Sequence, residues 1–119
     1  MDHRTTEDLE AALDHIRAAP ADVRRVDLVV RRPAEGERDV LAAGELDPPH
    51  GRVGDNWAQR GSSRTDDGSA HPDMQLNVIN ARLATYVAVD PERRALAGDQ
   101  LHLDIDPSVA NLPPGTPLA

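Results

Sequence analysis

The 119-residue chain contains no cysteine, no lysine and no phenylalanine, and only one tryptophan and one tyrosine. Without cysteine, these residues can form no disulfide, no thiolate nucleophile and no thiolate metal site. Without lysine, they can form no Schiff base with pyridoxal phosphate or with a carbonyl substrate. The composition therefore excludes several classes of covalent catalysis before any motif is considered.

Large apolar side chains are also scarce. Leucine, isoleucine and valine number 25, whereas the smaller alanine alone contributes 17 residues. The combined content of leucine, isoleucine, valine and phenylalanine is close to the level below which chains tend to be disordered. We therefore expect a single domain with a thin core. No apolar run approaches the length of a membrane span and no signal peptide is apparent. We therefore expect a cytoplasmic protein that does not bind membranes.

The charge is strongly acidic, with 13 basic residues, all arginine, against 21 acidic ones and a net charge of −8. Nucleic-acid binding requires clustered excess positive charge, so we expect none. A chain whose basic residues are all arginine is suited to binding oxyanions, because the planar guanidinium group can donate two parallel hydrogen bonds to them. A genome rich in G and C would give the same arginine and alanine bias without any functional meaning.

Periodicity predicts a β-rich fold with flanking helices. Thr5 or Thr6 can cap a helix that Pro20 stops, and Asn80 and Asp90 can cap two later helical segments. The pattern predicts helices over 5–19 and 81–88 and after Asp90, a hairpin of strands over 23–32 and 38–46, and strands over 74–80 and 100–106. In the last strand, His102, Asp104 and Asp106 alternate with apolar residues. We expect them on its solvated face, with divalent-ion binding as the alternative.

The stretch from His50 to Asp73 shows neither helical nor strand periodicity, and loops of this length are usually functional or disordered. It holds four glycines, three arginines, two histidines and the only tryptophan. Guanidinium groups, hydroxyls and glycine N–H groups together can bind an oxyanion. We predict a ligand-binding site formed by Arg52, Gly54, Asp55, Asn56, Arg60, Gly61, Ser62, Ser63, Arg64 and His71.

Other interpretations of the same stretch remain open. It can be a solvated surface loop without a ligand. His50, His71, Asp55 and Asp73 could bind a metal, but their spacing matches no known metal motif, and we predict no metal site. A serine–histidine–aspartate triad lacks a nucleophile-elbow motif, so the sequence does not identify catalytic residues and leaves open whether the protein is an enzyme. Trp57 is either a core anchor beneath the loop or a wall for stacking.

Several segments, in order, resemble MOSC domains, which are named after the C-terminal part of molybdenum-cofactor sulfurase. The resemblance covers about Val26 to the C-terminus. It rests on Gly54-Asp55-Asn56-Trp57, Arg60-Gly61-Ser62-Ser63-Arg64, the run from His71 to Arg82, Leu96-Ala97-Gly98-Asp99-Gln100-Leu101 and Asn111-Leu112-Pro113-Pro114-Gly115-Thr116. It implies a barrel-like fold of mainly β structure and a molybdenum cofactor, with its pterin, as the ligand.

The chain also departs from the pattern of the MOSC family. The family's late cysteine, which is proposed to carry sulfur or take part in N-oxide reduction, is not among these residues. We therefore expect an incomplete MOSC-like barrel over residues 23–119, preceded by an N-terminal helix within residues 1–22. We predict binding of a small oxyanionic ligand. The alternative is a truncated, non-catalytic interaction module whose missing strands come from a partner or from self-association at open sheet edges.

Overall fold

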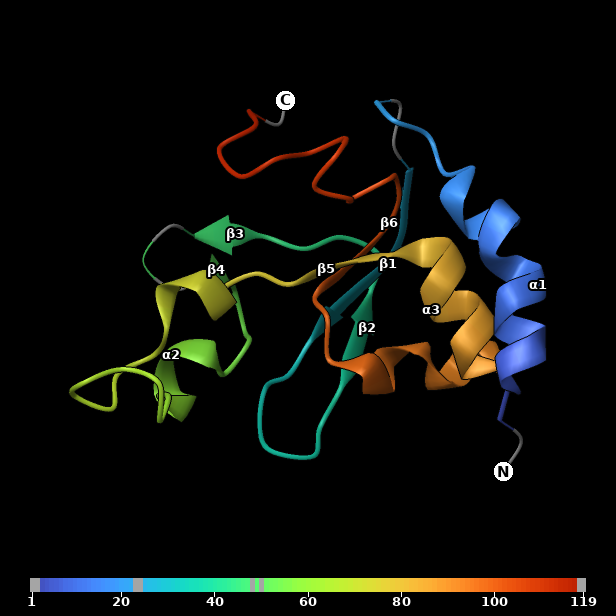
Figure 1. Cartoon of the computed structure of the whole chain (residues 1–119). Helices are drawn as coiled ribbons and strands as arrows, with labels where there is room; N and C mark the ends of the chain where they lie inside the picture. The colour runs from blue at the N-terminus through green and yellow to red at the C-terminus, as the bar shows by residue number, and fades with distance from the viewer. Residues whose placement is uncertain (1–2, 23–24, 48, 50, 118–119) are drawn as a thin grey trace.

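The computed structural model describes residues 3–22, 25–47, 49 and 51–117, with only the backbone described at residues 51, 52 and 73. Its centre is a four-stranded sheet in the order β2-β1-β6-β5 (Figure 1). The strands are β1 (Arg25–Arg31), β2 (Asp39–Leu41), β5 (Val78–Asn80) and β6 (Leu101–Asp104). β1 runs antiparallel to β2 and β6, whereas β5 is parallel to β6, so the sheet is mixed.

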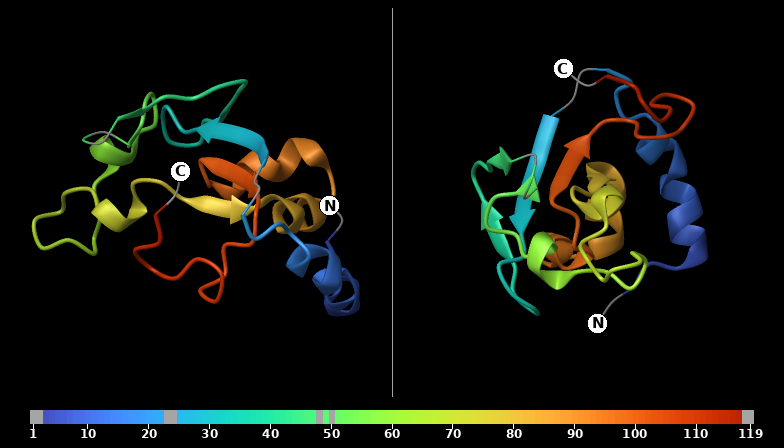
Figure 2. Two further views of the ribbon diagram at one scale, coloured as in Figure 1. Left: turned by 90° about the horizontal axis from the view of Figure 1, so that it is seen from above. Right: turned by 90° about the vertical axis from the view of Figure 1, so that its left-hand side faces the viewer.

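Helices cover this sheet on one side. The helical elements are α1 (Thr6–Arg17), α2 (Trp57–Arg60), α3 (Ala81–Ala88) and the 3₁₀ helices η1 (Pro72–Met74) and η2 (Pro91–Ala97). α3 contacts β5 and β6, and α1 packs against α3 from outside (Figure 2). The prediction of a mainly β fold with flanking helices is confirmed only in part: the sheet and its flanking helices are present, but the described residues are not mainly β. Helical residues outnumber strand residues and the described sheet is open, so the fold is a small α/β fold.

The N-terminal helix forms as its sequence predicts. The Thr5 hydroxyl accepts a hydrogen bond from the Asp8 N–H at 3.1 Å, and the Asp8 carboxylate accepts one from the Thr5 N–H at 3.1 Å. This reciprocal pair satisfies two otherwise unpartnered donors at the helix start. The Tyr86 hydroxyl on α3 donates to the Asp8 carbonyl oxygen at 3.0 Å. None of the described helices has the length and apolar character needed to cross a membrane.

The predicted hairpin of β1 and β2 is present but shorter than expected. β2 ends at Leu41, and Leu46 lies instead in β3 (Leu46–Asp47), which pairs with β4 (Gly51–Arg52) in a separate two-stranded sheet. Val26 is exposed, whereas Leu28 and Val30 on the same strand are buried, and the register of β1 against β6 shifts between Val26 and Leu28.

The second half of the chain forms a parallel crossover. The expected strand over 74–80 forms only from Val78, because Met74 belongs to η1. Asn80 caps α3 by accepting from the Leu83 N–H at 3.0 Å, and its amide donates to the Ile105 carbonyl oxygen at 3.2 Å. α3 and η2 then return the chain to β6, as a connection between parallel strands requires.

The prediction that His102 lies on the solvated face of the last strand is wrong. This side chain is 0% exposed, and Gln100, two residues before it, is 1% exposed. β6 lies between β1 and β5 and helices pack over it, so its buried positions do not follow a simple two-residue alternation. Burial is the main cause that lowers the pKa of His102 from its ordinary 6.5. His102 therefore belongs to the core and not to a solvated metal-binding face.

Candidate functional site

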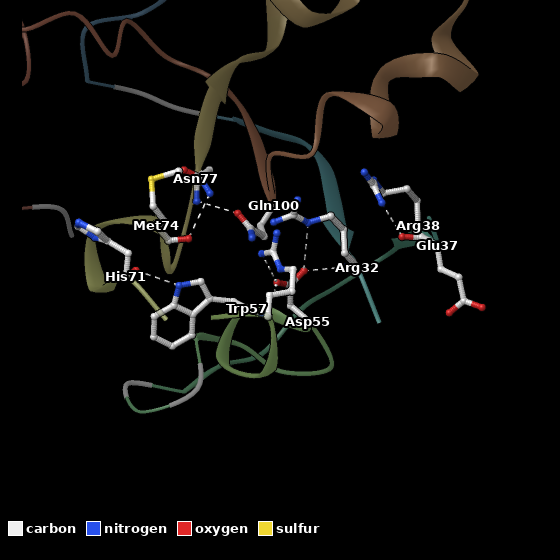
Figure 3. A network of polar contacts seen from close by, with 10 residues as sticks. Arg32, Glu37, Arg38, Asp55, Trp57, His71, Met74, Asn77 and Gln100 are labelled. Atoms are coloured by element: carbon white, nitrogen blue, oxygen red, sulfur yellow. Dashed lines mark hydrogen bonds and ion pairs between the residues drawn. The ribbon is translucent and has the colours of Figure 1, made fainter. Parts of the chain in front are cut away.

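Asp55 is the central group of the predicted loop. Its side chain is 0% exposed. One carboxylate oxygen accepts a hydrogen bond from the Arg32 N–H at 2.7 Å, and the other accepts one from the Trp57 N–H at 3.1 Å (Figure 3). The Asn56 N–H in turn donates to the Arg32 carbonyl oxygen at 2.7 Å. These bonds fix the start of α2 against the residue that follows β1.

Two arginines approach the Asp55 carboxylate from different elements. Arg32 Nε lies 3.9 Å from Asp55 Oδ1, and Arg60 Nη2 on α2 lies 3.7 Å from Asp55 Oδ2. Both distances exceed the 2.7–2.9 Å of a charge-assisted hydrogen bond. Asp55 therefore gathers the two guanidinium groups without saturating their donors.

A third arginine completes the cluster. Arg38, in the connection between β1 and β2, lines a cavity of about 280 Å³ together with Arg32, Arg60 and Asn56; its other walls are Ala34, Glu35 and Gly36. Within the described residues, Arg32 Nε, Arg38 Nε and Asn56 Oδ1 are buried and form no hydrogen bond. Buried polar atoms normally have a partner. The cavity thus collects donors and an acceptor that a ligand could satisfy.

The arginines also affect each other's protonation. The pKa of Arg32 is lowered, first by burial and next by the positive charge of Arg60, while Asp55 opposes the shift and Arg38 adds to it. Asp99 also favours the charged form of Arg32, but the balance of all these effects still lowers its pKa. An anion in the cavity would stabilise the charged form of the cluster.

The two predicted glycines have backbone roles. Gly54 has a φ of +87°, and a Cβ there would lie 2.5 Å from Arg31 Nη1. Gly61 ends α2 with a φ of +66°, and a Cβ there would collide with the Gly68 carbonyl oxygen. Both positions therefore favour glycine. Gly61 serves the closure of the following loop rather than the approach of a ligand.

Ser62, Ser63 and Arg64 lie in that closed loop, away from the cluster. The Ser62 N–H donates to the Gly68 carbonyl oxygen at 3.1 Å, and the Ser62 hydroxyl accepts from the Arg64 N–H at 3.1 Å. Ser63 and Arg64 are exposed. None of the three lines the arginine cavity. The structure therefore separates them from Arg60, although they follow it directly in the sequence.

His71 and Trp57 support the loop. The indole N–H of Trp57 donates to the His71 carbonyl oxygen at 3.0 Å, and Trp57 is 9% exposed. Trp57 is thus a core anchor, one of its two predicted roles. The His71 ring lies away from Asp55 (Figure 3). The predicted Arg52 is paired with Leu46 through the backbone of β4, its side chain lies outside the described residues, and so does His50.

Sequence reasoning found Asp55, Asn56 and Arg60 but missed Arg32 and Arg38. Arg32 directly follows β1, and Arg38 directly precedes β2. The available sequence signal was a pair of arginines on either side of a turn. Nothing in the sequence of that turn indicates that the two arginines lie beside residues 55–60. Only the hydrogen bonds between Arg32 and the Asp55-Asn56 step bring them together.

Among the residues that the structure describes, no three histidine, aspartate or glutamate side chains are grouped closely enough to hold a metal ion.

The chain was compared with family models, with curated proteins and with solved structures. None of the three comparisons found a match.

Proposed function

We propose that this protein binds a small oxyanionic ligand, of the phosphate or molybdate type, at the cluster formed by Arg32, Arg38, Arg60 and Asn56. The observation that supports the proposal is that Arg32, Arg38 and Arg60 line one cavity, while the buried Nε atoms of Arg32 and Arg38 form no hydrogen bond within the described residues. Guanidinium groups present a planar fork of donors that matches phosphate and similar oxyanions.

Each residue has a defined part in this proposal. Arg32 and Arg38 donate from their Nε atoms, and Arg60, which is 37% exposed, closes the site from α2. Asn56 Oδ1 is an acceptor, so it would bind a protonated oxygen of the ligand. Asp55 does not contact the ligand, because its oxygens already accept backbone hydrogen bonds. It positions the arginines instead.

The resemblance to MOSC domains adds a specific ligand to the proposal. On that resemblance the four-stranded sheet would be part of an incomplete MOSC-like barrel, and the oxyanion would belong to a molybdenum-pterin cofactor. The sequence segments that carry the resemblance include Asp55, Asn56 and Arg60, which lie at the cluster. The proposal concerns binding alone and assigns no catalytic residue.

The test is calorimetric titration of the protein with inorganic phosphate, molybdate and an anionic pterin. Arg60→Ala should weaken binding about tenfold or more, since a hydrogen bond to a charged group contributes about 1.5–3 kcal/mol. Arg64→Ala is the matched control, because Arg64 is exposed and lies outside the cavity. Equal losses in the two variants, or no binding by the unaltered protein, would contradict the proposal.

A second function, self-association, is favoured by the sheet edges. Within the described residues, β2 and β5 are the edges of the four-stranded sheet, and Val40 and Val78 on them are 60% and 40% exposed. Exposed edge strands pair readily with another chain. Sedimentation velocity over a range of concentrations tests this function, and an oligomer that Val78→Lys dissociates would support it. A monomer at every concentration would exclude it.

A further inference from the structure

A second cavity adjoins the arginine site. Arg32 and Arg60 line both cavities, and the second has a volume of about 290 Å³. Its remaining walls are Met74 from η1, Asn77 before β5, and the turn of Ala97, Gly98 and Asp99 between η2 and β6. The two guanidinium groups thus form a shared wall between a basic cavity and one of different chemistry.

The second cavity is rich in hydrogen-bond acceptors. Asp99 contributes a half-buried carboxylate, and carboxylates accept hydrogen bonds but do not donate them. Asn77 adds a side-chain amide whose Nδ2 already donates to the Met74 carbonyl oxygen at 3.3 Å. Met74, which is 45% exposed, adds an apolar wall. Hydroxyl or ring N–H groups on a ligand would match this arrangement.

Asp99 is more than a counterion for Arg32. It does favour the charged form of that guanidinium, but it is the weakest of the five influences on Arg32, after burial, Arg60, Asp55 and Arg38. The ion pairs that Arg32 and Arg60 form in this site are with Asp55 and not with Asp99. Its carboxylate therefore retains acceptor capacity toward a ligand in the cavity.

We infer that the ligand is a phosphate monoester whose organic part carries hydrogen-bond donors, with the size and character of a sugar phosphate. The phosphate lies among Arg32, Arg38 and Arg60, and the organic part extends past the shared wall to Asp99 and Asn77. This inference rests on the proposed oxyanion site and adds the chemistry of the group attached to the oxyanion.

The experiment compares three probes by calorimetry on the whole chain: inorganic phosphate, ribose 5-phosphate and free ribose. We expect ribose 5-phosphate to bind about tenfold tighter than phosphate, because hydrogen bonds to a charged acceptor such as Asp99 are stronger than those between neutral groups. Free ribose should not bind measurably, since it lacks the group that the arginines hold.

Two matched variants separate hydrogen bonding from net charge. Asp99→Asn removes a carboxylate from the second cavity, and Glu35→Gln removes one from the first cavity. Both changes should leave phosphate affinity equal or slightly higher. Only Asp99→Asn should reduce the preference for ribose 5-phosphate over phosphate.

The outcomes distinguish this inference from the proposed function. If phosphate binds but ribose 5-phosphate binds no more tightly, the inference is wrong and the oxyanion site stands. A preference that the two variants reduce equally reflects net charge and also overturns the inference. If neither anion binds, the proposed function fails, and the inference fails with it. If Asp99→Asn does not fold, the unaltered protein still tests the inference, because equal affinities for ribose 5-phosphate and phosphate would overturn it.

Discussion

Two groups of arginines in this molecule are held in different ways. Beside α1 and α3, Arg82 Nε lies 2.8 Å from Asp104 Oδ1 and Arg82 Nη1 lies 2.8 Å from the His15 carbonyl oxygen. At the end of β1, by contrast, the guanidinium atoms Arg32 Nε and Arg60 Nη2 lie 3.9 and 3.7 Å from the Asp55 carboxylate oxygens. Both groups border cavities, of about 440 and 280 Å³.

This difference in how the guanidinium donors are satisfied distinguishes structural arginines from candidate ligand-binding ones. Arg82 uses its donors to join α3 to β6 and to the end of α1, so a ligand would have to displace existing bonds. The cluster of Arg32, Arg38 and Arg60 has buried Nε donors on two members without partners in the described residues. A cavity beside charged residues is therefore weak evidence for a site unless the donors around it are unsatisfied.

The largest expected effect comes from Asp55→Asn. This change removes the only fully buried carboxylate that faces the two guanidinium groups in the described site. Breaking a buried charge pair typically costs about 3–5 kcal/mol, so we expect a loss of stability of that order in urea denaturation. Asp104→Asn is the comparison, because Asp104 is 21% exposed and should cost about 1 kcal/mol. Similar losses in both variants would erase the distinction between the two arginine groups.

His102 tests whether every unpartnered buried group marks a site. Within the described residues neither ring nitrogen forms a hydrogen bond of full geometry, although a weak contact with the Asp99 backbone acts to raise the pKa of the ring, and no cavity described above is lined by this side chain. An apolar replacement removes the desolvation penalty of such a group. His102→Leu should therefore stabilise the protein by about 1 kcal/mol in urea denaturation at neutral pH. A clear loss of stability would show that the ring has a partner.

The lowered pKa of His102 also leads to a prediction of how the stability of the protein depends on pH. Burial lowers the pKa of His102 in the folded state below 6.5; Asp99 and Asp27 favour its protonated form and Arg94 opposes it. As pH falls below about 6.5, the unfolded chain binds the proton first, so stability decreases until the pH reaches the lower folded pKa. His102→Leu should remove this part of the acid sensitivity. Denaturation at a series of pH values from 7.5 to about 4.5 checks it.

A smaller effect is expected at Val89, which lines the cavity beside Arg82. Val89 has a φ of 65° and a ψ of −62°, and the Asp90 N–H donates to the Ala88 carbonyl oxygen at 2.7 Å. This is a strained γ-turn, and a β-branched residue is poorly suited to it. Val89→Gly should raise stability by about 1 kcal/mol in thermal denaturation. Val87→Gly, within α3, should lower it by about the same amount.

The sequence predicted the elements whose signals are local. The caps at Thr5, Asn80 and Asp90 gave the helix starts, because a short polar side chain satisfies the first free N–H groups within three residues. The hairpin of β1 and β2 followed from the turn between them. Features that depend on distant partners were missed, such as the register shift between Val26 and Leu28 and the burial of His102 between two strands.

The candidate site shows the same limit. Arg60 and Asp55 were found because they lie in one glycine-rich stretch. Arg32 and Arg38 were missed because only hydrogen bonds between the Asp55-Asn56 step and the end of β1 bring them there. Conversely, Arg64 was included for its proximity in sequence, and the tight loop that Gly61 permits turns it away from the cavity.

The smallest expected effect is that of Arg82→Ala. The Arg82 side chain is 24% exposed and that of its partner Asp104 is 21% exposed, so water can reach and stabilise the Asp104 carboxylate that remains after the substitution. We expect a loss of about 1 kcal/mol or less in urea denaturation and no change in phosphate affinity by calorimetry. Arg32→Ala should have the opposite profile, with phosphate binding lost. If Arg82→Ala weakened phosphate binding as much as Arg32→Ala, saturated donors would not exclude a ligand, and the anion site would have to be sought between α1 and α3.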